Sequence, residues 1–144
     1  MLIWILKKLF LISLVVNDVG VVYSERYRII STPWFKLYLD KIIHSDIEPY
    51  LYDSPFDFSI RVLKGWYKES SATAPNWGSV KQTTFGPNSK ATYQHDDVRK
   101  IEVISGPVWV LIKAGTVTYP HGFQTKLGWI EEDRYKRMRA SGQV

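Results

Sequence analysis

The sequence predicts a single all-β domain, built as an antiparallel sandwich or barrel. Short runs of alternating apolar and polar residues recur about every ten residues, separated by turns rich in Gly, Pro, Asn and Ser. No helical segments alternate with these runs, which argues against a parallel α/β fold. The length of 144 residues fits one domain, and an aromatic content of 15% suits a β-rich core.

Residues 1–20 are predicted to form an N-terminal arm outside the barrel. Apolar residues recur at helical spacing at Leu2, Ile5, Leu6, Leu9 and Phe10. This spacing predicts a short amphipathic helix over residues 2–12, which would pack on its own domain, a neighbouring subunit or a membrane surface. Lys7 and Lys8 divide the apolar run, so neither half is long enough to span a membrane, and no small-residue cleavage site follows. We therefore expect a protein that is neither secreted nor membrane-spanning.

The barrel is predicted to occupy residues 21–137. The alternation predicts strands at 21–30, 35–43, 57–63, 66–69, 80–85, 99–104, 108–113, 117–119 and 128–130. Residues 70–78 predict a loop, because they are rich in Ser, Ala, Pro, Asn and Gly. Residues 131–139 alternate in charge, which predicts either a frayed end or a final helical turn, before a flexible tail at 138–144.

The composition excludes several kinds of chemistry. No cysteine is present, so disulfides, thiolate nucleophiles and Cys-based metal sites are excluded. The three histidines, His44, His95 and His121, lie far apart and form no metal-binding motif, and no phosphate-binding or nucleophile-elbow motif occurs. We assign no catalytic residue and no cofactor. The net charge of +5 is mild, and acidic residues offset the basic C-terminus, so we do not predict nucleic-acid binding.

Several phrases, in order and spacing, resemble one protein family. They are Tyr23 to Tyr27, Leu39 to Asp46, Leu51 to Phe58, Val62 to Glu69, Ile101 to Val103, Gly106 to Leu111, His121 to Phe123, and Gly128-Trp129. Together they look like the small single-domain cupins (RmlC-like jelly rolls) that occur in bacteria and in tailed-phage genomes. The resemblance covers about residues 21–135. It implies a double-stranded β-helix whose histidines hold a divalent metal ion in the barrel mouth.

This sequence departs from the family's pattern at every metal-ligand position. By the resemblance, the family's histidines fall on Asp40, Tyr52, Ser54 and Arg99. A Ser hydroxyl is a weak ligand, a Tyr phenol with an ordinary pKa near 10 must first lose its proton, and an Arg guanidinium repels a metal ion. We therefore expect a metal-free barrel, in which these four residues cluster and Arg99 pairs with Asp40 in place of the metal.

Two other interpretations of this pocket stay open. Asp40, Asp53, Glu69 and His95 together offer ligand types that would rebuild a metal site, as in an enzyme with atypical ligands. Alternatively, Arg99 would bind a small anionic molecule in a polar pocket.

The function that we expect is non-enzymatic: a structural or interaction protein that forms a homo-oligomer or joins a larger assembly. The residues expected at an interface are Trp4, Leu6 and Phe10 in the arm, and Trp77 in the loop at 70–78. The family's frequency in phage genomes implies a virion component, such as a decoration or tail-associated subunit, located in the virion or the host cytoplasm. The alternative function is that of a pocket protein, either the metal-dependent enzyme or the anion binder.

Overall fold

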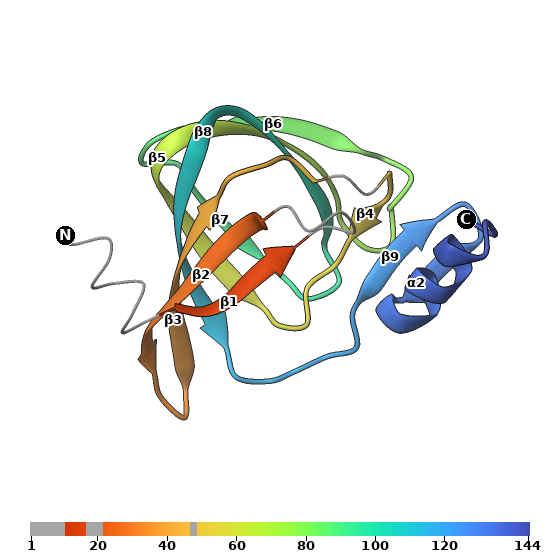
Figure 1. Cartoon of the computed structure of the whole chain (residues 1–144), viewed down its shortest axis with the longest axis horizontal. Helices are drawn as coiled ribbons and strands as arrows, with labels where there is room; N and C mark the ends of the chain where they lie inside the picture. Colours follow the sequence, from red (N-terminus) through yellow and green to blue (C-terminus); the bar gives the residue numbers. More distant parts are fainter. Residues whose placement is uncertain (1–10, 17–21, 47–48) are drawn as a thin grey trace.

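The computed structural model describes residues 11–16, 22–46 and 49–144, and it confirms the all-β prediction (Figure 1). Ten strands form one antiparallel sheet. They are β1 (Leu11–Val16), β2 (Val22–Ser31), β3 (Phe35–Ile42), β4 (Leu51–Tyr52), β5 (Phe58–Ala72), β6 (Lys81–Phe85), β7 (Lys90–Tyr93), β8 (Val98–Gly115), β9 (Gly122–Thr125) and β10 (Gly128–Glu131). In the described part of the chain, one helix, α2 (Glu132–Ala140), follows them.

Two long strands, β5 and β8, hold the barrel together. They pair along almost their whole lengths, from Phe58 opposite Ala114 to Ala72 opposite Val98. The second half of β8 also pairs with β3, and its first half pairs with β4 through Arg99. Register shifts between Val62 and Tyr67 mark the place where β5 departs from regular pairing. Figure 1 shows both strands curving around the barrel, so the two halves of the sheet enclose a common interior.

The alternation of apolar and polar residues determines which side chains enter that interior. The buried residues Ile60 and Val62 on β5, and Val110 and Ile112 on β8, alternate with exposed or half-buried ones. Each fully buried aliphatic side chain contributes roughly 1.5–3 kcal/mol by leaving water. These residues form the aliphatic part of the core, and tyrosines and phenylalanines complete it.

The N-terminal prediction is corrected where the structure describes it. The helix was expected over residues 2–12, of which 2–10 lie outside the described residues. Leu11–Val16 is instead the strand β1, paired antiparallel with β2. The run Leu-Ile-Ser-Leu-Val-Val includes three β-branched apolar residues, which suit a strand better than a helix.

The described helix is C-terminal and agrees with the final helical turn expected at 131–139. Tyr135 fastens α2 to the sheet: its side chain is 1% exposed and stacks on Phe123 with ring centroids 4.1 Å apart. The helix runs to Ala140, into the segment expected as a tail. Within the described ranges, no helix is long and apolar enough to cross a membrane.

Candidate functional site

The barrel interior holds a buried cation, Arg99 of β8. The Arg99 side chain is 15% exposed, and its Nη1 lies 3.3 Å from Oε2 of Glu69 on β5, whose side chain is 2% exposed. The guanidinium carbon lies 4.8 Å from the ring centroid of Phe58 and 5.0 Å from that of Tyr93. One carboxylate and two aromatic rings therefore contact the guanidinium and take the place of water around it.

Glu69 is tied to the same arrangement from its other side. The hydroxyl of Tyr93 lies 2.9 and 2.8 Å from the two carboxylate oxygens of Glu69, to which it donates. Burial raises the pKa of Glu69, and the charge of Arg99 and the hydrogen bond from Tyr93 oppose that rise. Burial alone would lower the pKa of Arg99, but Tyr52 and Glu69 raise it above the ordinary arginine value, so Arg99 stays charged.

Tyr67 is a third buried polar residue of the barrel interior. Its side chain is 1% exposed, and its hydroxyl has no hydrogen-bond partner among the described residues. Burial raises the pKa of Tyr67, the charge of Arg99 lowers it and that of Glu69 raises it. Tyr67 and Glu69 lie two residues apart in β5, so both side chains are on the same face of the strand. A buried hydroxyl without a partner is uncommon in native proteins.

A second polar cluster is centred on Asp46. Its carboxylate accepts hydrogen bonds from the hydroxyls of Tyr23 and Tyr52, the latter at 2.9 Å, and from the backbone N–H of Ile101 at 2.7 Å. Burial raises the pKa of both phenols, so they remain protonated at neutral pH. Because Tyr52 lies opposite Arg99 in the β4–β8 register, the two clusters are adjacent.

The expected pair between Arg99 and Asp40 is wrong. Asp40 accepts two hydrogen bonds from Arg26, at 2.8 Å from Nε and 2.7 Å from Nη2. The physical reason is register: Arg26 of β2 lies directly opposite Asp40 of β3. The bidentate geometry favours this partner, and the negative charge beside Arg99 comes from Glu69 instead.

Asp53 and His95, which were also considered as ligands of an atypical metal site, each have partners of their own. Asp53 accepts hydrogen bonds from the backbone N–H of Gly122 and from Nε1 of Trp129, both at 2.7 Å. His95 stacks on Tyr119 with ring centroids 3.6 Å apart, and its Nδ1 lies 3.1 Å from Asp57. Among the described residues, no three His, Asp or Glu side chains converge on a point that could hold a metal ion.

The remaining predicted residues either hydrogen-bond to groups other than Arg99 and Glu69 or lie outside the described residues. The backbone N–H of Ser54 donates to the carbonyl of His95 at 3.3 Å, in the loop after β4. Trp77 is half-buried, and its indole N–H donates to the carbonyl of Asp96 at 3.2 Å. The predicted interface residues Trp4, Leu6 and Phe10 lie outside the described residues.

The donor set in the barrel does not fit the divalent metal ion that the family resemblance implies. At the implied positions, Tyr52 is a phenol whose pKa is raised, and Arg99 is a cation. Both carboxylates that contact these two residues are already held: Glu69 by Arg99 and Tyr93, and Asp46 by Tyr23, Tyr52 and the backbone of Ile101. A metal ion here would meet a fixed positive charge and no imidazole, so we derive no chemistry through a metal.

Sequence reasoning missed the parts that Glu69, Tyr93, Tyr23 and Asp46 play. One signal was available for Glu69: it lies two residues after Tyr67 in an extended strand, so both side chains face the interior. The pairing of β5 with β7 brings Tyr93 into the interior beside Phe58. No pattern in the sequence predicts that non-local pairing.

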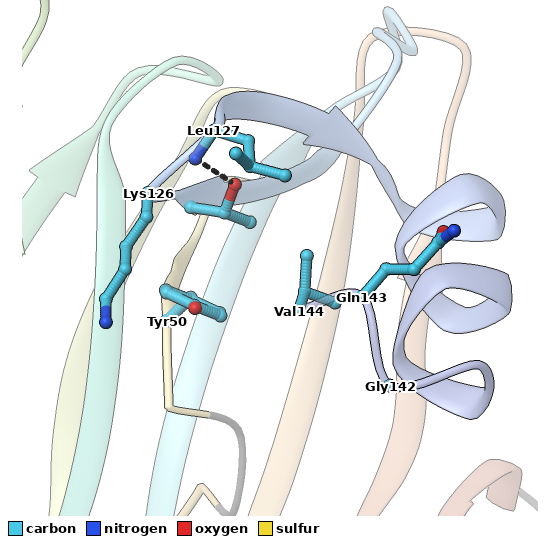
Figure 2. Close-up of a pocket in the computed structure, with 7 residues that line it drawn as sticks. Tyr50, Lys126, Leu127, Gly142, Gln143 and Val144 are labelled. Atoms are coloured by element: carbon cyan, nitrogen blue, oxygen red, sulfur yellow. Dashed lines mark hydrogen bonds between the residues drawn. The ribbon is translucent and has the colours of Figure 1, made fainter.

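A separate hollow of about 280 Å³ lies between the β9–β10 turn and the C-terminal segment (Figure 2). Its lining consists of Tyr50, Thr125, Lys126, Leu127 and residues 142–144. Figure 2 shows the Lys126 ammonium directed away from the C-terminal residues. None of the interior residues described above lines this hollow, so it is unrelated to the Arg99 cluster.

No family model matches the chain, and no curated protein matches its sequence. Solved structures do resemble it. The iron(II) form of HppE with an alternative substrate has a TM-score of 0.55 and 12% identity over 73% of this chain and 54% of that one. KdgF from Halomonas sp. has a TM-score of 0.52 and 12% identity over 72% and 94% of the two chains. The polyketide cyclase RemF from Streptomyces resistomycificus has a TM-score of 0.54 and 17% identity over 81% and 79%.

These three proteins are cupin-fold proteins, and the likeness shows that this chain has a cupin-type jelly-roll fold. At identities this low, the comparison concerns the fold alone. The chain also matches only about half the length of HppE, 54%. Enzymes therefore occur among its structural neighbours, but the likeness assigns no chemistry to this chain.

The interior ion pair is testable by a double-mutant cycle. We expect Arg99→Met and Glu69→Gln each to lower the free energy of unfolding by about 3 kcal/mol, because each leaves a buried group without its partner. The double variant should lose less than the sum of the two, since neither charge is then stranded. Urea unfolding measures all three changes.

The matched control is the pair Lys68–Glu102 on the same two strands, with N–O distance 3.1 Å and side chains 36% and 63% exposed. Its cycle, with Lys68→Met and Glu102→Gln, should show a coupling of about 1 kcal/mol or less. Equal coupling energies in the two cycles would contradict a special role for the Arg99–Glu69 pair.

Proposed function

We propose that this chain is a non-enzymatic, metal-independent scaffold with a cupin-type fold, acting through association with other proteins or with copies of itself. The observation that supports this most is the Arg99–Glu69 pair, which fills the barrel interior where the family resemblance implies a metal ion. The interior charges satisfy one another: Arg26 pairs with Asp40, and Arg99 with Glu69. A site whose charged groups are already paired has little capacity to activate a substrate.

The net charge of the interior also disfavours an anionic substrate. Two arginines, Arg26 and Arg99, are accompanied by three carboxylates, Asp40, Glu69 and Asp46. Because the carboxylates outnumber the cations, an added anion would meet a slightly negative surrounding. The interior is therefore better suited to holding strands together than to capturing a charged ligand.

The edge strand β1 supports association. Within the described residues, β1 pairs only with β2, so its other edge offers backbone N–H and C=O groups. Its sequence contains no charged residue and no proline, the usual devices that protect an edge strand from pairing. We infer that a partner strand, from a second copy or from another protein, adds to this edge. A virion component, which the family resemblance implies, stays a prediction that no contact or comparison tests.

Self-association and its metal dependence test this proposal together. We expect sedimentation velocity of the full chain to show a concentration-dependent dimer or larger species, unchanged by a chelator because no metal takes part. Val15→Pro in β1 should weaken it by removing a backbone donor from that strand. A strict monomer at every concentration that also captures no protein encoded beside it would contradict the scaffold proposal.

A second candidate function has one observation in its favour. The buried Tyr67 hydroxyl has no partner, and Arg99 keeps 15% of its side chain exposed, so together they could hold a small anion such as phosphate. If so, Tyr67→Phe should weaken phosphate binding measured by calorimetry at least ten-fold, and Arg99→Ala should abolish it.

Under the scaffold proposal, phosphate does not bind. Tyr67→Phe should then leave stability unchanged or slightly raised, because its hydroxyl has no hydrogen bond to lose. Tyr93→Phe is the matched control, and it should destabilise the protein because it removes the hydrogen bonds to Glu69. Measurable phosphate affinity that Arg99→Ala abolishes would favour the second candidate.

A further inference from the structure

The turn between β2 and β3 carries an exposed apolar tip. The side chains of Ile29 and Ile30 are 45% and 41% exposed, and that of Trp34 is 78% exposed. The turn itself is well ordered by hydrogen bonds: Oγ1 of Thr32 accepts from the backbone N–H groups of Trp34 and Phe35 at 3.3 and 3.0 Å. Trp34 is therefore held outward by local backbone geometry, and Figure 1 shows this hairpin projecting beyond the barrel.

Cations are interspersed with these apolar groups along the hairpin. Arg28 and Lys36 flank it on the two strands, and Lys113 lies opposite Leu37 in the β3–β8 register. The Lys113 ammonium sits 4.8 Å from the ring centroid of Phe35. None of the three cations has an ion-pair partner among the described residues, and residues 28–37 contain no Asp or Glu.

An exposed indole and several cations side by side at one tip match the interfacial layer of an anionic membrane. Trp34 comes first at the turn, Lys36 follows, and Ile30 lies level with Lys113. The aromatic ring and the ammonium groups would therefore meet the headgroup region together. Figure 1 shows the hairpin projecting beyond the barrel, so its tip can reach a lipid interface ahead of the barrel.

We propose that the β2–β3 hairpin docks the protein on anionic lipid surfaces, with Ile29, Ile30 and Trp34 entering the interface and Arg28, Lys36 and Lys113 contacting the headgroups. This goes beyond the scaffold function and does not depend on the barrel interior. One apolar tip with a few cations gives reversible, peripheral binding, because each cation contributes only about a five-fold gain in partitioning near an anionic surface.

Cosedimentation of the full chain with lipid vesicles tests the proposal. We expect binding to vesicles of phosphatidylcholine mixed with phosphatidylglycerol, and little binding to pure phosphatidylcholine. Trp34→Ser should reduce binding to the anionic vesicles at least ten-fold, because it removes the most exposed apolar group at the tip. The control, Leu127→Ser, alters a side chain 69% exposed in the β9–β10 turn and should bind as the unchanged protein does.

Charge reversal tests whether vesicle binding depends on the hairpin cations or only on the net charge of the protein. The double variant Arg28→Glu/Lys113→Glu should lose binding, while Lys81→Glu/Lys90→Glu on β6 and β7, with the same change in net charge, should lose much less. Equal losses in the two double variants, or no binding to anionic vesicles, would overturn the proposal. A dimer that Trp34→Ser dissociates, without vesicle binding, would assign the tip to a protein interface and would overturn it as well.

Discussion

The ion pair between Arg99 and Glu69 is the interaction on which the interior of this barrel depends. It joins the neighbouring strands β5 and β8 on their inward face, and Tyr93 from β7 and Phe58 complete the surroundings of the charge. Isolated buried charges are strongly unfavourable, so each member of the pair requires the other. In the cupins that the sequence resembles, histidines hold a metal ion in this region. In this chain, the Arg99 guanidinium supplies a positive charge there instead.

A second ion pair and a tyrosine-bound carboxylate extend this arrangement. Arg26 and Asp40 connect β2 to β3, and Asp46 connects Tyr23, Tyr52 and the backbone of β8. All but the Tyr52–Asp46 hydrogen bond join residues at least 14 positions apart in the sequence. Because polar groups in a low-dielectric interior must satisfy one another, they also specify how the strands align. These interior polar contacts therefore stabilise the fold, while the functions that we propose lie on the surface.

The sequence predicted the fold class, and most strand positions, because alternation is a local property of the chain. From the resemblance to cupins we expected Arg99 and Tyr52 to lie close together, and in the structure the two residues lie opposite each other on β8 and β4. The partner of Arg99 could not be predicted in the same way. Asp40 and Glu69 both face the interior, and only the register of β2 with β3, which places Arg26 opposite Asp40, decides between them. The segment 11–16 was misassigned because apolar spacing over a short run fits a helix and a strand alike.

Whether the purified protein holds a metal ion decides between a metal-free interior and an atypical metal site. The purified, untagged full chain would be exposed to manganese, iron, nickel and zinc, dialysed, and examined by elemental mass spectrometry. We expect no stoichiometric metal, because Arg99 places a positive charge where the ion would bind and Glu69 is already paired. One tightly held metal ion per chain, lost in an Arg99→Ala or Glu69→Gln variant, would contradict it and would favour an enzyme with atypical ligands.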